Sequence, residues 1–320
     1  MTLGQLLSGG PQPPWLRWLF LVGAASLLMR LVLRSDYGTS AVLYVLVPFV
    51  VGLLIYVFTT QPVGLTKGRR AARHIRSSVI VMLASSAILM EGFLCVLFAF
   101  PIYLVFAGIV LAVMPPPRAK ADDRRAIADT FRGSWIPLLV VAMSVEGVSP
   151  SLSFGRDHTV TRKAVVDAGV DAIHAKLAEP IALSESPSRF LSLFPLPHTV
   201  EAGSLNAGDI HTSHFTYRRW PVFNTHEGRM EIELTDVTRE RIRTAVIRND
   251  AYFSHYMTVK GTEIALTPLP DGRTEVALSI HYRRDLDPAW YFGPLQKLAM
   301  RQSADYLIAQ IIAPDGSLLE

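Results

Sequence analysis

Two hydrophobicity patterns divide the chain. Residues 15–148 contain long apolar runs, whereas residues 149–320 alternate apolar and polar positions as a soluble domain does. Residues 41–60 carry no charge over about 20 residues, the length that a helix needs to cross a bilayer. Residues 18–33 form an earlier run, which we expect to be a retained span because another follows closely. The pattern therefore predicts a transmembrane anchor domain over residues 1–148, followed by a second domain.

The third apolar run, residues 78–114, is too long for one crossing and short for two. Glu91 lies near its middle. A carboxylate inside a bilayer is costly and commonly serves an ion or proton relay. The length of the run also requires a turn near this point, so Glu91 equally fits an interfacial turn between helices over 78–97 and 99–114. We favour the turn and keep Glu91 as a membrane candidate.

Loop charge predicts the orientation of these spans. The loops 61–77 and 115–134 each carry five Lys or Arg, so we expect both to be cytoplasmic, in a bacterial inner membrane. Both loops can lie on the same side of the membrane only if two spans separate them. A further apolar segment, residues 135–148 beginning at Trp135, is only marginally long. The sequence thus predicts four or five transmembrane helices. The second domain is periplasmic if residues 135–148 span the membrane, and otherwise cytoplasmic.

The second domain, residues 149–320, has the signals of an α+β fold. A strand over 158–168 precedes short helices over 169–179 and 186–194. Five antiparallel strands then follow, over residues 209–220, 228–237, 239–249, 254–269 and 273–284. The last helix, 285–312, has apolar residues at helical spacing and needs an apolar surface to lie on. A curved antiparallel sheet with one apolar face provides that surface.

Three segments within this order of strands and helices resemble the START-like helix-grip superfamily, also called SRPBCC or polyketide cyclase-like. They are "VTRKAVVDAGVDAIHAKL", "LTPLPDGRTEVALSIHYRRDLDPAWYFGPLQ" and the terminal helix. Gly169 stands where the family has a proline. The string of Tyr282, Pro288, Trp290 and Tyr291 is similar to the tail of a membrane-anchored bacterial branch. The resemblance implies a curved sheet wrapped around a long helix, enclosing a cavity. The superfamily includes enzymes, carriers and receptors, so the fold alone does not choose between them.

Composition and charge exclude some functions. The net charge of +4 is mild and is concentrated in the two loops, which does not favour nucleic-acid binding. Cys95 is the single cysteine, so no disulfide or paired-cysteine zinc site can form within the chain. His211 and His214 lie three apart on a predicted strand and point to opposite faces, so they cannot bind one ion. We expect no metal and no cofactor.

Alternation along the last strands indicates which residues line the cavity. Leu278, Ile280 and Tyr282 share one face of a strand, and aromatic residues after Pro288 could rim the cavity mouth. His255 could instead be a sheet residue satisfied locally, and Trp290 could simply pack at a helix end. The ligand-cavity candidates are Phe253, His255, Met257, Leu278, Ile280, Tyr282, Trp290, Tyr291 and Leu295.

The leading hypothesis is a membrane-anchored binding protein whose cavity holds a lipid or other hydrophobic small molecule. The bilayer and that ligand are the expected partners. A first alternative is a cyclase- or hydrolase-like enzyme acting on a hydrophobic substrate, with His255, Tyr282 and Glu231 as candidate titratable groups. A second alternative is a transport or structural membrane protein that uses Glu91. The sequence leaves catalysis open.

Overall fold

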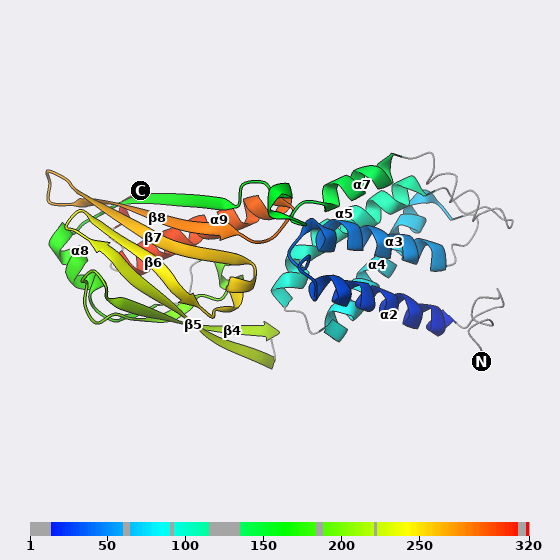
Figure 1. Ribbon diagram of the computed structural model, residues 1–320, viewed down its shortest axis with the longest axis horizontal. Helices are drawn as coiled ribbons and strands as arrows, with labels where there is room; N and C mark the ends of the chain where they lie inside the picture. Colours follow the sequence, from blue (N-terminus) through cyan, green and yellow to red (C-terminus); the bar gives the residue numbers. More distant parts are fainter. Residues whose placement is uncertain are drawn as a thin grey trace. The chain divides into compact units, whose positions relative to one another are not determined.

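The structure is a computed structural model that describes residues 14–59, 65–89, 93–114, 135–183, 188–220, 223–312 and 318–319. It divides into two compact units, Met1–Ser153 and Phe154–Glu320, which Figure 1 colours along the chain. Each unit has its own cluster of buried apolar residues. Each therefore has the core that a structural domain needs.

The first unit is helical. Its described helices are α2 (Pro14–Leu33), η1 (Val42–Leu46), α3 (Val47–Phe58), α4 (Lys67–Leu89), α5 (Phe93–Val113), α7 (Ile136–Ser144) and η2 (Pro150–Leu152). The π-helical η1 continues directly into α3, so the two form one continuous apolar helix. Pro48 lies just after the π turn, which accommodates the missing backbone N–H and the bulk of the ring.

The helix α4 carries polar side chains toward the interior of this unit and apolar side chains outward. Its buried residues include His74 and four serines, Ser77, Ser78, Ser85 and Ser86. Ile80, Leu83 and Ile88 are exposed on the same helix. The other helices also expose large apolar residues, among them Leu19, Leu27, Leu31, Val57, Val105 and Leu138. Exposed apolar surface of this extent commonly marks a contact with a membrane or with another protein.

Two described helices are long and apolar enough to cross a membrane, over Leu16–Leu33 and Val96–Val113. The continuous helix Val42–Phe58 is apolar but shorter than these two. The helix α4 does not qualify because its first half is strongly basic. The prediction of four or five transmembrane helices is therefore corrected to two candidates within the part of the chain that the structure describes.

The helix boundaries predicted around Glu91 were also wrong. The helices there are α4 and α5, which end and begin at Leu89 and Phe93, rather than helices over 78–97 and 99–114. Glu91 itself lies outside the described residues. Pro101 lies inside α5, as a helix with membrane-like composition tolerates.

The second unit is built on one sheet with strand order β2-β3-β4-β5-β6-β7-β8-β1-β9, in which neighbouring strands run antiparallel. The strands are β1 (Asp157–Val166), β2 (Ile181–Ala182), β3 (Pro197–Glu201), β4 (Ile210–Trp220), β5 (Phe223–Val237), β6 (Arg241–Asn249), β7 (Met257–Pro268), β8 (Thr274–Arg284) and β9 (Leu318–Leu319). The helical elements are α8 (Val170–Leu177), η3 (Leu191–Leu193), η4 (Tyr252–His255), α9 (Ala289–Leu307) and η5 (Ile308–Ile312).

The sheet curves, and α9 lies along it (Figure 1). A curved antiparallel sheet with a long carboxy-terminal helix on its concave face fits the helix-grip architecture that the sequence predicted. The Asp271-Gly272 turn joins β7 to β8, and Gly272 has φ of 85°, which favours glycine. The helix predicted over 186–194 is a single 3₁₀ turn, η3, in its described part. The strand predicted over 254–269 begins later, at Met257, because η4 occupies the residues before it.

Candidate functional site

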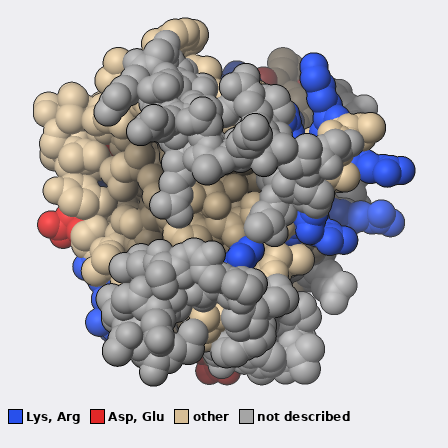
Figure 2. Space-filling view, turned by 90° about the vertical axis from the view of Figure 1, so that its right-hand side faces the viewer, with Lys and Arg blue, Asp and Glu red and all other residues tan. Residues whose placement is uncertain are grey.

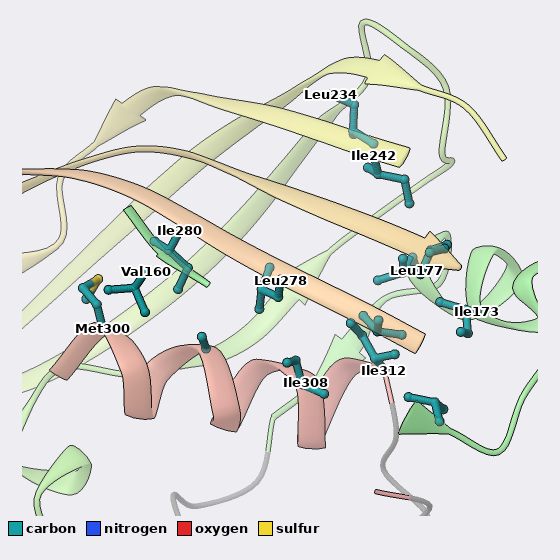
Figure 3. Packing of buried hydrophobic residues seen from close by; sticks show 14 of the residues in the cluster. Val160, Ile173, Leu177, Leu234, Ile242, Leu278, Ile280, Met300, Ile308 and Ile312 are labelled. Atoms are coloured by element: carbon teal, nitrogen blue, oxygen red, sulfur yellow. The ribbon is translucent and has the colours of Figure 1, made fainter. Parts of the chain in front are cut away.

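The covered side of the concave face consists of β1 and β8 beneath α9. Burial alternates along β8, and its buried apolar and aromatic inner residues are Val276, Leu278, Ile280 and Tyr282. Met300 and Ala304 of α9 fall four residues apart and pack against this row. Figure 3 shows Met300 beside Val160 and Ile280. These side chains form a closed core layer.

The half-buried strip is the part of the same face that belongs to β5, β6 and β7. Its members are Met230, Ile232, Val246, Val259 and Ile264. Register places Ile264 and Val259 on the concave face, because they lie opposite Leu278 and Tyr282. Ile242 lies opposite Ile264, and Val246 shares its face of β6 by alternation. Ile232 lies opposite Val246, and Met230 shares its face of β5. Each of the five is only partly buried. Inner-facing apolar residues of a sheet are normally covered by a second layer, so this strip is apolar surface with incomplete cover.

One end of the concave face is closed by α8. Ile173 and Leu177 on α8 are buried against Leu234, Ile242 and Leu266. In Figure 3 Ile173 and Leu177 lie beyond the end of β8, near Ile312. The apolar packing is dense here, so incomplete cover is confined to the other part of the face.

The opposite end carries aromatic residues around η4. The ring of Tyr252 stacks on Tyr217 of β4 with centroids 4.7 Å apart. Phe253 packs edge-on against Phe215, also on β4, with centroids 5.5 Å apart. Gly228 makes this approach possible, because a Cβ there would lie 2.5 Å from the carbonyl oxygen of Asp250. The chain before η4 is thus held against β5, at the end of the half-buried strip.

A buried ion-pair cluster joins the end of β8 to the start of α9. Arg284 and Asp287 are both fully buried and hydrogen-bonded to each other. Arg156 donates a second hydrogen bond to Asp287 over 2.5 Å. The backbone N–H of Arg284 donates to the carbonyl oxygen of Arg156 over 2.8 Å. Two cations share one carboxylate, so the cluster fixes the segment that leads into α9.

Tyr282 and His158 lie side by side next to this cluster. They are direct register partners on β8 and β1, with ring centroids 5.6 Å apart. Burial raises the pKa of Tyr282 above its usual value, although Arg301 and Arg284 act in the opposite direction. Burial, then Arg284 and Lys297, lower the pKa of His158. Both groups are therefore more strongly held in their neutral forms than free side chains.

The predicted cavity residues fall into separate groups. Met257, Leu278, Ile280 and Tyr282 are buried together in the core of the second unit. Phe253 packs against that core and is partly buried. His255 was predicted on a strand, and this was wrong. It lies on η4, it is exposed, and its Nδ1 lies 3.0 Å from the carbonyl oxygen of Tyr252. The alternation argument failed because a 3₁₀ turn replaces the expected start of the strand.

The other candidates lie along the start of α9. Trp290 is 50% exposed, whereas Tyr291 and Leu295 are half-buried. The candidate enzyme groups are not brought together. Glu231 alternates with the inward-facing Ile232 and pairs with Arg229 over 3.2 Å. His255 is exposed on η4 and Tyr282 is buried under α9. Within the described residues, no group of His, Cys, Asp and Glu side chains could hold a metal ion.

None of the five residues of the half-buried strip was among the predicted cavity residues. Ile232 and Val246 occur in predicted strands, but neither was assigned to a face of the sheet. What alternation could not show is that α9 is too narrow to cover them. The relevant signal was the number of strands, because a single helix covers only a few of them.

Comparisons with known proteins give structural likenesses only. Neither a protein-family model nor a curated protein matches this chain. The chain is similar to the solved structure of protein CV1439 from Chromobacterium violaceum, with 19% identity and a TM-score of 0.32, over 49% of this chain and 98% of the other. It is similar to the Zhui aromatase/cyclase from Streptomyces sp. R1128, with 15% identity and a TM-score of 0.32, over 49% and 93%.

A third likeness is to a START superfamily protein from Mycobacterium smegmatis. It has 12% identity and a TM-score of 0.31, over 48% of this chain and 97% of the other. By name, the second of these proteins is an aromatase/cyclase and the third belongs to the START superfamily. The helix-grip description of the second unit rests on its own element order, on the sheet topology and on the place of α9.

Proposed function

We propose that the second unit binds a hydrophobic small molecule or lipid on its concave face. The observation that carries this proposal is the half-buried strip, which is apolar, inward-facing and incompletely covered. Burying such a surface against an apolar ligand is favourable in proportion to the area removed from water. In this proposal Phe253, Met257 and Val259 lie where the strip meets η4 and contact the ligand, whereas Leu278 and Ile280 chiefly hold α9.

We also propose that the first unit anchors the protein in a bilayer. The outward apolar residues of its helices support this, together with buried serines on α4, because membrane bundles place small and polar residues inside. The two candidate spanning helices are α2 and α5. The bilayer would then be a nearby source of the apolar ligand.

Charge supports a cytoplasmic location for the end at which α2 and α4 begin. The helix α4 starts with Lys67, Arg69, Arg70 and Arg73. Figure 2 looks at this end and shows Lys and Arg gathered along one side. The backbone N–H of Ala41 donates to the carbonyl oxygen of Glu146 over 2.9 Å, so the chain after α7 leaves beside the segment that precedes η1. The second unit then lies on the extracytoplasmic side if the segment that begins at Trp135 also crosses the membrane, and otherwise on the cytoplasmic side.

The experiment is solvent extraction and mass spectrometry of the purified full chain, using two neighbouring substitutions on β6. Val246 belongs to the half-buried strip, whereas Ile247 is 48% exposed and serves as the matched control. We expect an apolar compound in the wild type and in Ile247→Gln, and its loss from Val246→Gln. Annular lipid is common to all three samples and cancels. Equal yields of every apolar compound from the three proteins would contradict the proposal.

A further inference from the structure

Among the residues that the structure describes, two buried amide atoms at the η4 end of the concave face have no hydrogen-bond partner. They are Nδ2 of Asn249 and Oε1 of Gln296. Asn249 ends β6 and lies opposite Met230 of the half-buried strip. Gln296 lies on α9, on the face that it shares with Ala299 and Ser303. A buried polar atom without a partner is unfavourable, so a ligand group that satisfied both atoms would be bound selectively.

Local hydrogen bonds determine which atom of each amide is left available to a ligand. Oδ1 of Asn249 accepts from the backbone N–H of Ala251 over 3.1 Å. Nε2 of Gln296 donates to the carbonyl oxygen of Tyr256 over 3.1 Å. Turning either amide around would set donor against donor or acceptor against acceptor. The site therefore presents one N–H donor, from Asn249, and one acceptor oxygen, from Gln296.

The same short segment holds both amides. Ala251 and Tyr256 are the residues on either side of η4, and η4 is closed by a hydrogen bond from the N–H of Ser254 to the carbonyl oxygen of Ala251. The donor and the acceptor thus lie at the same end of the concave face. Between them and the α8 end runs the half-buried strip. The arrangement is an apolar surface with one polar donor and one polar acceptor at the same end.

We propose that the concave face selects an uncharged amphipathic ligand whose polar end is a hydroxyl group. This inference rests on the proposed function. A hydroxyl group can both donate, as Oε1 of Gln296 requires, and accept, as Nδ2 of Asn249 requires. A carboxylate or phosphate only accepts, so it would face the Gln296 oxygen without a proton to give. An ammonium group only donates and would leave Asn249 unpartnered.

The test compares three probes of equal chain length on the full chain in lipid nanodiscs at pH 8. The probes are dodecan-1-ol, dodecanoate and dodecane, and empty nanodiscs give the partition background. We expect dodecan-1-ol to bind about tenfold more tightly than dodecanoate, as the loss of one or two buried hydrogen bonds implies. Asn249→Leu and Gln296→Leu should each remove most of this preference while dodecane binding is kept. Gln302→Leu is the control, because the Oε1 atom of Gln302 already accepts from Ser188.

The outcomes separate the two proposals. If no probe binds above background, the proposed function fails and this inference fails with it. If dodecanoate binds as tightly as dodecan-1-ol, apolar binding stands and the hydroxyl inference is overturned. If the alcohol preference survives both Leu substitutions, the two amide atoms are not what recognises the hydroxyl, and the inference is again overturned.

Discussion

The two sides of one concave face differ in how they are covered, although their sequences alternate alike. On the covered side, Leu278 is 3% exposed beneath α9. On the half-buried strip, Ile264 lies directly opposite Leu278 in the register and remains partly exposed. The chemical character of the two residues is the same. The difference arises from the width of a single helix, which covers β1 and β8 and leaves β5 to β7 incompletely covered.

This difference separates two roles that an apolar residue can have. Residues under α9 contribute to folding stability because their burial is complete in the folded chain. Residues of the strip contribute less to folding, and the rest of their burial is available to a ligand.

Removing the carboxylate of Asp287 should have the largest effect. Asp287→Ala removes the buried carboxylate that Arg284 and Arg156 share, and loss of one member of a buried ion pair costs roughly 3–5 kcal/mol. We expect urea unfolding of the full chain, followed by tryptophan fluorescence, to show a loss of that size. If α9 left the covered side, the apolar residues of both sides would be incompletely buried and the two sides would no longer differ.

Asp305→Ala is the matched control, since it also removes a carboxylate that ties α9 to the sheet. Asp305 pairs with Arg162 over 2.5 Å, but both side chains are 47% exposed. Exposed pairs contribute about 0–1 kcal/mol. If Asp305→Ala destabilised the chain as much as Asp287→Ala, burial would not be what makes the cluster at β8 important.

The paired substitutions Leu278→Ala and Ile264→Ala compare the two sides directly. Leu278→Ala should lower the free energy of unfolding by about 2–5 kcal/mol, as deletion of a buried leucine side chain does. Ile264→Ala should cost less than half as much, because Ile264 is already partly exposed. The order should reverse for the affinity for dodecan-1-ol, which Ile264→Ala should lower more than Leu278→Ala does. Equal effects of the two substitutions on both quantities would show that the concave face is a uniform core.

The sequence predicted the scaffold of this face well, and the reasons are local. Alternation over Val276, Leu278 and Ile280 defined one face of β8, and the spacing of Met300 and Ala304 defined the helix that covers it. Asp271-Gly272 marked the hairpin between the two strands. Each of these signals acts over a few residues, so no knowledge of distant contacts was needed.

The candidate site was predicted less well because it depends on contacts between distant segments. His255 was placed on a strand, since its neighbours alternate, but η4 turns the chain there so that the ring of Tyr252 can stack on Tyr217. The unpartnered atoms of Asn249 and Gln296 belong to segments nearly fifty residues apart. Only the folded chain shows that η4 holds both amides at one end of the face.

Alkaline pH should show the smallest effect, through Tyr282. Its pKa is raised by burial, so the folded state holds the phenol neutral more strongly than the unfolded state does. Because the pKa of Tyr282 is higher in the folded chain, the neutral phenol stabilises the folded state. This contribution is complete at pH values below the pKa in the unfolded chain, about 10, and is lost as the pH rises toward and through the pKa in the folded chain. The wild type should therefore lose more stability than Tyr282→Phe between pH 9 and 11 in urea unfolding experiments. Tyr291 and Tyr306, whose pKa values burial also raises, titrate in both proteins and cancel in the comparison. Parallel curves for the two proteins would mean that water reaches the phenol, and that α9 covers its side of the face less completely than the burial of Tyr282 indicates.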